Sequence, residues 1–149
     1  LARYADVLAR LATPYKVDGR GKVTATSYSA QALSASTGVV STVQDLARFD
    51  GSLTTLLAPD TRAAAWNRSA DSVPTGLGWF VQSYNGTRLV WHFGIAKDAY
   101  SSLILKVPEK DLTFIVLANS DGLSAPYSLE NGDVTKSLFA TVFLKLFVP

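Results

Sequence analysis

The stretch from residue 77 to residue 118 alternates between apolar runs and tight-turn signals, and this alternation limits the fold more than any other feature of the chain. Asn85-Gly86 separates the first two runs, and this pair favours the positive φ of a two-residue hairpin turn. Pro108–Asp111 separates the last two and has the composition of a turn. The predicted strands are Leu77–Gln82, Arg88–Phe93, Tyr100–Val107 and Leu112–Ala118. The region therefore predicts two successive hairpins in an antiparallel meander.

The last of these runs, Leu112–Ala118, is almost continuously apolar. A strand of that kind is typical of a position with both faces covered. We therefore expect it to lie centrally in the sheet and to pair with a further strand along its far edge.

Helix signals lie on both sides of the meander. Ser41–Gln44 has the capping-box pattern, so a helix should begin at Ser41 or Thr42, and Pro59 suits the first turn of a second helix ending near Trp66. After Asp133, apolar residues recur at four-residue steps, and a second row widens the stripe, which predicts a C-terminal helix packed on the sheet. The first row is Val134, Leu138, Val142 and Leu146, and the second is Phe139, Phe143 and Phe147. Helices are predicted over Leu1–Ala12, from Ser41 or Thr42, over Pro59–Trp66 and over Val134–Phe147, and an irregular segment over Lys16–Ser36. The fold class is therefore α+β, an antiparallel β-meander packed against helices with a C-terminal helix.

Composition excludes several classes of function. The chain has 149 residues, 48% of them hydrophobic, which suits one core and one domain. Its net charge of +2 is scattered rather than gathered into a basic face, so nucleic acid is not expected as a partner. Without cysteine and with a single histidine, we expect no disulfide, thiol nucleophile, metal site or cofactor. No apolar run is long enough to span a membrane.

The single histidine, His92, has two interpretations. A histidine in an apolar strand is more often a hydrogen-bonded structural residue than a catalyst. Period-two alternation, however, puts His92 on the face opposite Trp91 and Phe93, and Gly94 follows where backbone can approach a ligand closely. The string Ser83-Tyr84-Asn85 has the form of an S-x-N element, but its place in the hairpin makes turn chemistry the better explanation.

Five motifs in order resemble the serine β-lactamase-like family, especially its class C and esterase branch, over roughly residues 10 to 147. They are Thr37–Phe49, Thr75–Trp79, His92-Phe93-Gly94, Val107-Pro108-Glu109 and Leu117-Ala118-Asn119. The resemblance implies the C-terminal portion of a β-lactamase/transpeptidase-like fold, with residues 1–149 as a C-terminal fragment of a single hydrolase domain. The chain also begins at Leu1 and contains no methionine, which we interpret as the mark of a piece of a longer protein.

His92-Phe93-Gly94 matches the K-T-G strand of that family, which is H-x-G in several members. The resemblance implies that His92 replaces the lysine, polarising the site or helping proton transfer, and that the Ile95 N–H donates to an oxyanion. Gly94 belongs to the same wall of the site. Phe93 stands in place of a threonine whose hydroxyl would bind a β-lactam carboxylate. Asn119 matches a position near the substrate cleft, although a plain strand-terminating role explains it equally well.

The resemblance implies acyl-enzyme hydrolysis of an ester, amide, D-amino-acid peptide or β-lactam, in a periplasmic or secreted protein. The family's S-x-x-K nucleophile is missing, because no serine here has a lysine three residues later. We therefore expect the chain alone to be inactive and its partner to be the missing N-terminal half of the domain. A non-catalytic binding or interaction module remains the alternative. A free edge along Leu112–Ala118 would also favour homo-oligomers.

Overall fold

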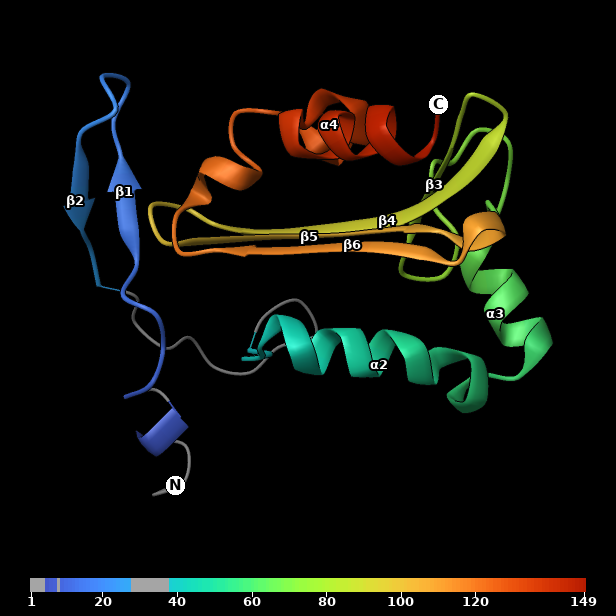
Figure 1. Cartoon of the computed structure of the whole chain (residues 1–149), viewed down its shortest axis with the longest axis horizontal. Coiled ribbons are helices and arrows are strands. Elements are labelled where there is room, and N and C mark those ends of the chain that lie inside the picture. The colour runs from blue at the N-terminus through green and yellow to red at the C-terminus, as the bar shows by residue number, and fades with distance from the viewer. Residues whose placement is uncertain (1–4, 8, 28–37) are drawn as a thin grey trace.

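The structure, a computed structural model, describes residues 5–7, 9–27 and 38–149. In chain order its main elements are β1 (Tyr15–Val17), β2 (Val23–Ala25), α2 (Val43–Leu56), α3 (Pro59–Trp66), β3 (Phe80–Tyr84), β4 (Thr87–Ala96), β5 (Tyr100–Val107), β6 (Leu112–Ala118) and α4 (Leu138–Phe147). Strands β3 to β6 form one antiparallel sheet in the order β3-β4-β5-β6. Helix α4 lies over one face of this sheet and α2 over the other (Figure 1).

The predicted meander is confirmed. Asn85 and Gly86 both have positive φ, 50° and 76°, and form the two-residue turn between β3 and β4. Pro108–Lys110 form a short 3₁₀ turn between β5 and β6, which ends at Asp111 in the left-handed region. Pairing runs without a bulge through both hairpins, from Phe80↔Trp91 onward. The turn residues therefore fix the register that the apolar alternation requires.

Strand β6 does not lie centrally. Within the described residues it is one of the two edge strands of the sheet, and most of its side chains are only half-buried. Phe114 stacks on Phe143 of α4, with ring centroids 4.9 Å apart, so one face is covered by that helix. The continuous apolar run therefore reflects the partial burial of both faces of β6, and not a position between two other strands.

The core fills the space between the sheet and α4. The side chains that alternate onto this face are buried together with two residues of the helix: Leu89, Trp91, Leu103, Leu105, Val107, Ala140 and Leu144. The expected apolar stripe of the C-terminal helix was wrong in phase. Residues 134–136 form a separate 3₁₀ turn and Ser137 is extended, so α4 begins at Leu138. Of the predicted stripe, Val134 is buried in the 3₁₀ turn, whereas Leu138, Val142 and Leu146 of α4 are exposed.

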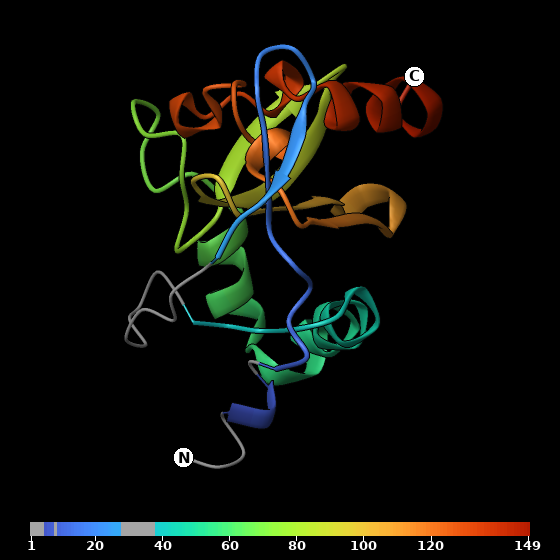
Figure 2. The same cartoon turned by 90° about the vertical axis from the view of Figure 1, so that its left-hand side faces the viewer.

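The N-terminal part of the chain forms a small hairpin that the sequence patterns missed. Strands β1 and β2 pair antiparallel, and the Asp18 carboxylate accepts from the backbone N–H groups of Arg20 and Lys22 in the turn. Strands of three residues are too short to show a period, which is why Lys16–Ser36 read as irregular. The hairpin stands at the end of the sheet where β4 meets β5 (Figure 2). Of the predicted helix over Leu1–Ala12, residues 5–7 are helical, and residues 1–4, 8 and 28–37 lie outside the described residues.

Helix α2 begins where the sequence predicts. Thr42 is its N-cap, and the Thr42 hydroxyl oxygen accepts from the backbone N–H of Asp45 at 3.1 Å. The Asp45 carboxylate also accepts from the Thr42 hydroxyl, so the capping contacts join Thr42 to Asp45 and not the predicted Ser41 to Gln44. Helix α3 begins at Pro59, also as predicted. These two helices cover only part of the sheet face that carries His92.

Candidate functional site

Strand β4 extends beyond the end of its neighbour β3. Residues 87–91 of β4 pair with β3, whereas residues 92–96 pair with β5 alone among the described residues. Within the part of the chain that the structure describes, the outer edge of β4 is therefore unpaired, or bare, for five residues. An unpaired strand edge offers backbone N–H and C=O groups to a ligand or to another strand.

The register shows which backbone groups face this edge. In a two-residue hairpin the closing pair, here Tyr84 and Thr87, exchanges hydrogen bonds. Backbone groups of successive residues point to alternate neighbours, so every second residue after Thr87 faces the β3 side. Without a bulge in the strand, Phe93 and Ile95 direct their N–H and C=O groups to the bare edge.

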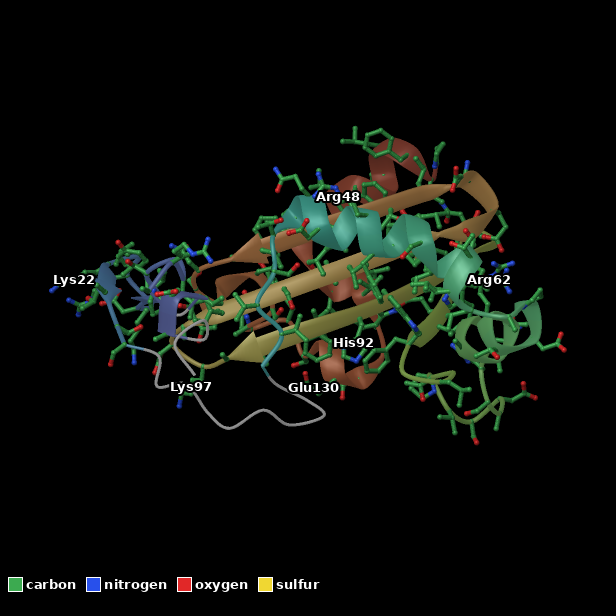
Figure 3. The ribbon with its side chains drawn as sticks, turned by 90° about the horizontal axis from the view of Figure 1, so that it is seen from below. Lys22, Arg48, Arg62, His92, Lys97 and Glu130 are labelled. Atoms are coloured by element: carbon green, nitrogen blue, oxygen red, sulfur yellow. The ribbon has the colours of Figure 1, made fainter. Side chains whose placement is uncertain are left out.

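His92 lies on the α2 face of the sheet, opposite Ile104 of β5, and is exposed. Figure 3 looks at this face and shows His92 on the same side of the sheet as α2. The Phe80 ring lies 5.9 Å from the imidazole at an interplanar angle of 45°. No hydrogen bond joins the imidazole to another described residue. This placement differs from that of a buried, hydrogen-bonded structural histidine.

The other residues of the motif divide between the two faces. Phe93 packs against the core, with its ring 6.1 Å from that of Trp91. Packing against β5 favours glycine at position 94, because a Cβ there would lie 2.6 Å from Ser102 Oγ. The side chain of Ile95 is half-exposed on the far side from His92. The strand end therefore brings together an exposed imidazole, a glycine and two outward-facing backbone N–H groups.

Asn119 lies apart from this group, two strands away at the end of β6. Its side-chain amide donates to the Thr13 carbonyl at 3.0 Å, and its own carbonyl accepts from the Tyr15 N–H at 2.7 Å. Both bonds hold the N-terminal segment against the sheet. In this arrangement Asn119 has the strand-terminating role that the sequence left open.

A buried ion pair on the same face as His92 escaped the sequence analysis. Lys106 of β5 donates to the Asp50 carboxylate of α2, and their side chains are only 8% and 11% exposed. The Thr113 hydroxyl also donates to Asp50, at 2.7 Å, and the Trp66 ring lies 5.3 Å from the ammonium. The alternation that puts Lys106 on the α2 face is readable in the sequence, but its partner 56 residues away is not.

Asp133 is the one described group with a resolved shift in acidity. The hydrogen bond from the Thr135 hydroxyl is the main cause that lowers the pKa of Asp133, and burial opposes it. The backbone N–H of Thr135 and the amide of Gln82 lower the pKa further. This carboxylate caps the 3₁₀ turn before α4 and so belongs to the scaffold.

No metal centre suggests itself in the part of the chain that the structure describes, where no three His, Cys, Asp or Glu side chains gather as ligands would. Within the same residues, no helix is long and apolar enough to cross a membrane.

The comparison with protein families decides the identity of the fold. The sequence profile described as Beta-lactamase matches residues 2–136. The chain belongs to the β-lactamase family. Both the expected family and the expected fold class are thereby confirmed, since the matched residues include the meander and the helices before it.

A solved structure supports the β-lactamase-family fold. The chain is similar to the octameric penicillin-binding protein homologue from Pyrococcus abyssi, with a TM-score of 0.68 and 20% sequence identity. The match covers 97% of this chain and 33% of that one, so the chain spans about a third of the length of this relative. At 20% sequence identity, this similarity supports the fold and nothing about activity. The comparison with curated proteins found no match.

Proposed function

We propose that this chain supplies the substrate-strand wall of a serine hydrolase that works through an acyl-enzyme. The observation that carries the proposal is the end of β4, where a β-lactamase-family chain presents an exposed His92 beside a bare strand edge. The substrate class is an ester, amide, D-amino-acid peptide or β-lactam. Residues 1–149 are then the C-terminal fragment of a single hydrolase domain.

Each residue of the wall has a role in this proposal. The Ile95 N–H, directed to the bare edge, donates to the oxyanion of the tetrahedral intermediate, an interaction typically worth about 3 kcal/mol of barrier. His92 stands where the family's lysine stands, and it polarises the site or relays a proton. Gly94 lets the substrate approach the strand, and Phe93 replaces a carboxylate-binding hydroxyl. Asn119 is retained as a substrate-binding candidate only through the family resemblance, since its amide holds Thr13.

The nucleophile must come from polypeptide other than these residues. No serine of the chain stands three residues before a lysine. An acyl-enzyme needs both a nucleophile and a base within hydrogen-bond reach of it. We therefore expect the chain alone to show no turnover, and a larger polypeptide with an S-x-x-K segment to be active.

A non-catalytic binding module is the second candidate. Phe93 removes a hydroxyl that the family uses on its substrate, and its ring is turned into the core. The turn after Gly94 also carries Lys97 and Asp98 where the family has small residues. A descendant that kept the fold but lost catalysis would tolerate both changes.

Active-site labelling separates the two candidates. The intact protein should react with a fluorophosphonate probe and hydrolyse p-nitrophenyl esters, whereas the non-catalytic module should do neither. Replacing His92 by alanine should lower kcat/KM by roughly a hundredfold or more. Lys145→Ala, an exposed change in α4 on the other face of the sheet, is the control and should leave kcat/KM unchanged. Absence of labelling, together with no S-x-x-K in the intact protein, would rule out the hydrolase.

We also propose that the outer edge of β6 favours association between copies. Leu117 of this strand is exposed, and among the described residues no strand pairs with residues 112–118 along this edge. Strand β1 reaches the edge only past the end of β6, where Tyr15 bridges Ser120. Lysine on an edge strand opposes strand pairing. Light scattering should therefore show association that Leu117→Lys weakens. A stable monomer at high concentration would contradict the proposal.

A further inference from the structure

A hollow of about 490 Å³ opens at the opposite end of β4 from the proposed acyl site. Its walls come from the β3–β4 hairpin, from the segment after α3 and from the turn after β5. Arg88, on its wall, is four residues from His92, which corresponds to roughly 13 Å along an extended strand. The hollow is therefore a separate place on the molecule.

Two arginines line the hollow, and each is anchored through part of its guanidinium group. Arg68 donates from Nε to the Val81 carbonyl at 2.9 Å. Arg88 donates from a terminal nitrogen to the Asn67 side-chain oxygen at 2.7 Å. A guanidinium has five N–H donors, so both arginines keep donors for another acceptor. The anchoring bonds fix the two groups in place before any ligand arrives.

The hollow carries a net positive charge and a hydrogen-bond donor that lacks an acceptor. Glu109 is the one acid on its wall, so two arginines and one glutamate leave one net positive charge. Glu109 forms an ion pair with Arg88, its carboxylate 3.3 Å from Nε, but this buried Nε has no hydrogen-bond partner among the described residues. A buried donor without a partner calls for an acceptor such as a water or an anion. Ser83 also lines the hollow.

We propose that this hollow binds a small oxyanion, the carboxylate or phosphate group of a ligand. Fixed guanidinium forks match the paired oxygens of both groups. Glu109 acts as a competing internal acceptor that holds Arg88 when the ligand is absent. Because the hollow lies away from His92, its occupancy is independent of acyl-enzyme chemistry.

Anion titration of the intact protein tests this site. Inorganic phosphate and acetate are titrated in separate arms at constant ionic strength set with chloride, and binding is followed by the NMR signals of the arginine Nε–H groups. Saturable binding is expected in at least one arm, and the stronger arm tells whether the group is phosphate or carboxylate. Saturation in neither arm would overturn the proposal.

Matched variants connect the binding to these residues. Arg68→Gln, an exposed change, should weaken binding roughly tenfold or more, because a hydrogen bond between charged groups is lost. Arg20→Gln removes the same charge in the β1–β2 turn and should leave affinity unchanged. Glu109→Gln should strengthen binding several-fold, whereas Glu130→Gln and His92→Ala should not. Equal affinities in the Arg68 and Arg20 variants would refute a built site.

Discussion

Removing the carboxylate of Asp50 should cost this protein a large share of its stability. Asp50 joins α2 to the sheet through its ion pair with Lys106 and through the Thr113 hydroxyl. The two charged side chains are 8% and 11% exposed, so water cannot replace a lost partner. Asp50→Ala therefore leaves the Lys106 ammonium buried beside Trp66 without its counter-charge.

The expected loss is about 3 to 5 kcal/mol, the usual cost of breaking a buried pair on one side. Alanine has a higher helix propensity than aspartate, and this offsets the loss by only about 0.5 kcal/mol. The exposed pair of Arg48 and Asp45 gives the contrast, because its side chains are 79% and 58% exposed. Arg48→Gln should therefore change stability by less than about 1 kcal/mol. A loss of about 3 to 5 kcal/mol is a fifth or more of the roughly 5 to 15 kcal/mol typical of a domain.

Urea unfolding followed by tryptophan fluorescence measures these differences, since Trp91 is fully buried in the core. The double variant Asp50→Ala with Lys106→Met should recover much of the loss, because an apolar pair replaces an unpaired charge. The reasoning fails if Asp50→Ala costs no more than Arg48→Gln. It also fails if the losses of the two single variants simply add in the double variant.

Three further outcomes follow from the scaffold. Gly76→Ala should strongly destabilise the fold, because the new Cβ would lie 2.3 Å from the Ala65 carbonyl oxygen. Gly51→Ala, in open space within α2, should be neutral or stabilising. Thermal unfolding compares the stability of the two variants. Leu144→Ala, in the core under α4, should cost about 2 to 5 kcal/mol in urea unfolding. Asp133→Ala should cost about 0.5 to 2 kcal/mol near neutral pH. Because the folded pKa of Asp133 is lowered, its stabilisation is present above the ordinary value of 3.8 and is lost as pH falls through the lower folded pKa, so the wild-type advantage should shrink only in acid; an advantage unchanged there would contradict this assignment.

The sequence predicted the meander well because two local signals agreed. Asn85-Gly86 allows one kind of turn, and the apolar runs on either side allow one register. The helix at Thr42 was equally readable, since a cap is a contact between neighbours in the chain. The family motifs added the correct fold class, which the family match over residues 2–136 confirms.

Features that depend on distant contacts were harder to read. The four-residue row Leu138, Val142 and Leu146 was predicted to face the sheet, but Ala140 and Leu144 are buried instead. Helix α4 is apolar nearly all round, so spacing alone could not tell which face is covered. The central position of β6 was wrong because a continuous apolar run cannot tell a neighbouring strand from partial helix cover. The Lys106–Asp50 pair joins segments 56 residues apart, so only the folded chain reveals it.

In the candidate site, too, the features set by neighbouring residues could be predicted, and those set by distant contacts could not. Alternation along the strand placed His92 opposite Trp91, and the structure has it exposed on that face. The bare edge beside it depends on how far β3 extends, which the predicted strand at Leu77–Gln82 did not give. The roles of His92, Ile95 and their neighbours in catalysis remain predictions.

A crystal structure of the intact protein with a covalently bound phosphonate tests the central claim most directly. The account predicts a phosphonyl oxygen within hydrogen-bond distance of the Ile95 N–H, with the His92 imidazole lining the same pocket. An adduct elsewhere on the molecule, or another strand of the protein paired along residues 92–96, would contradict it.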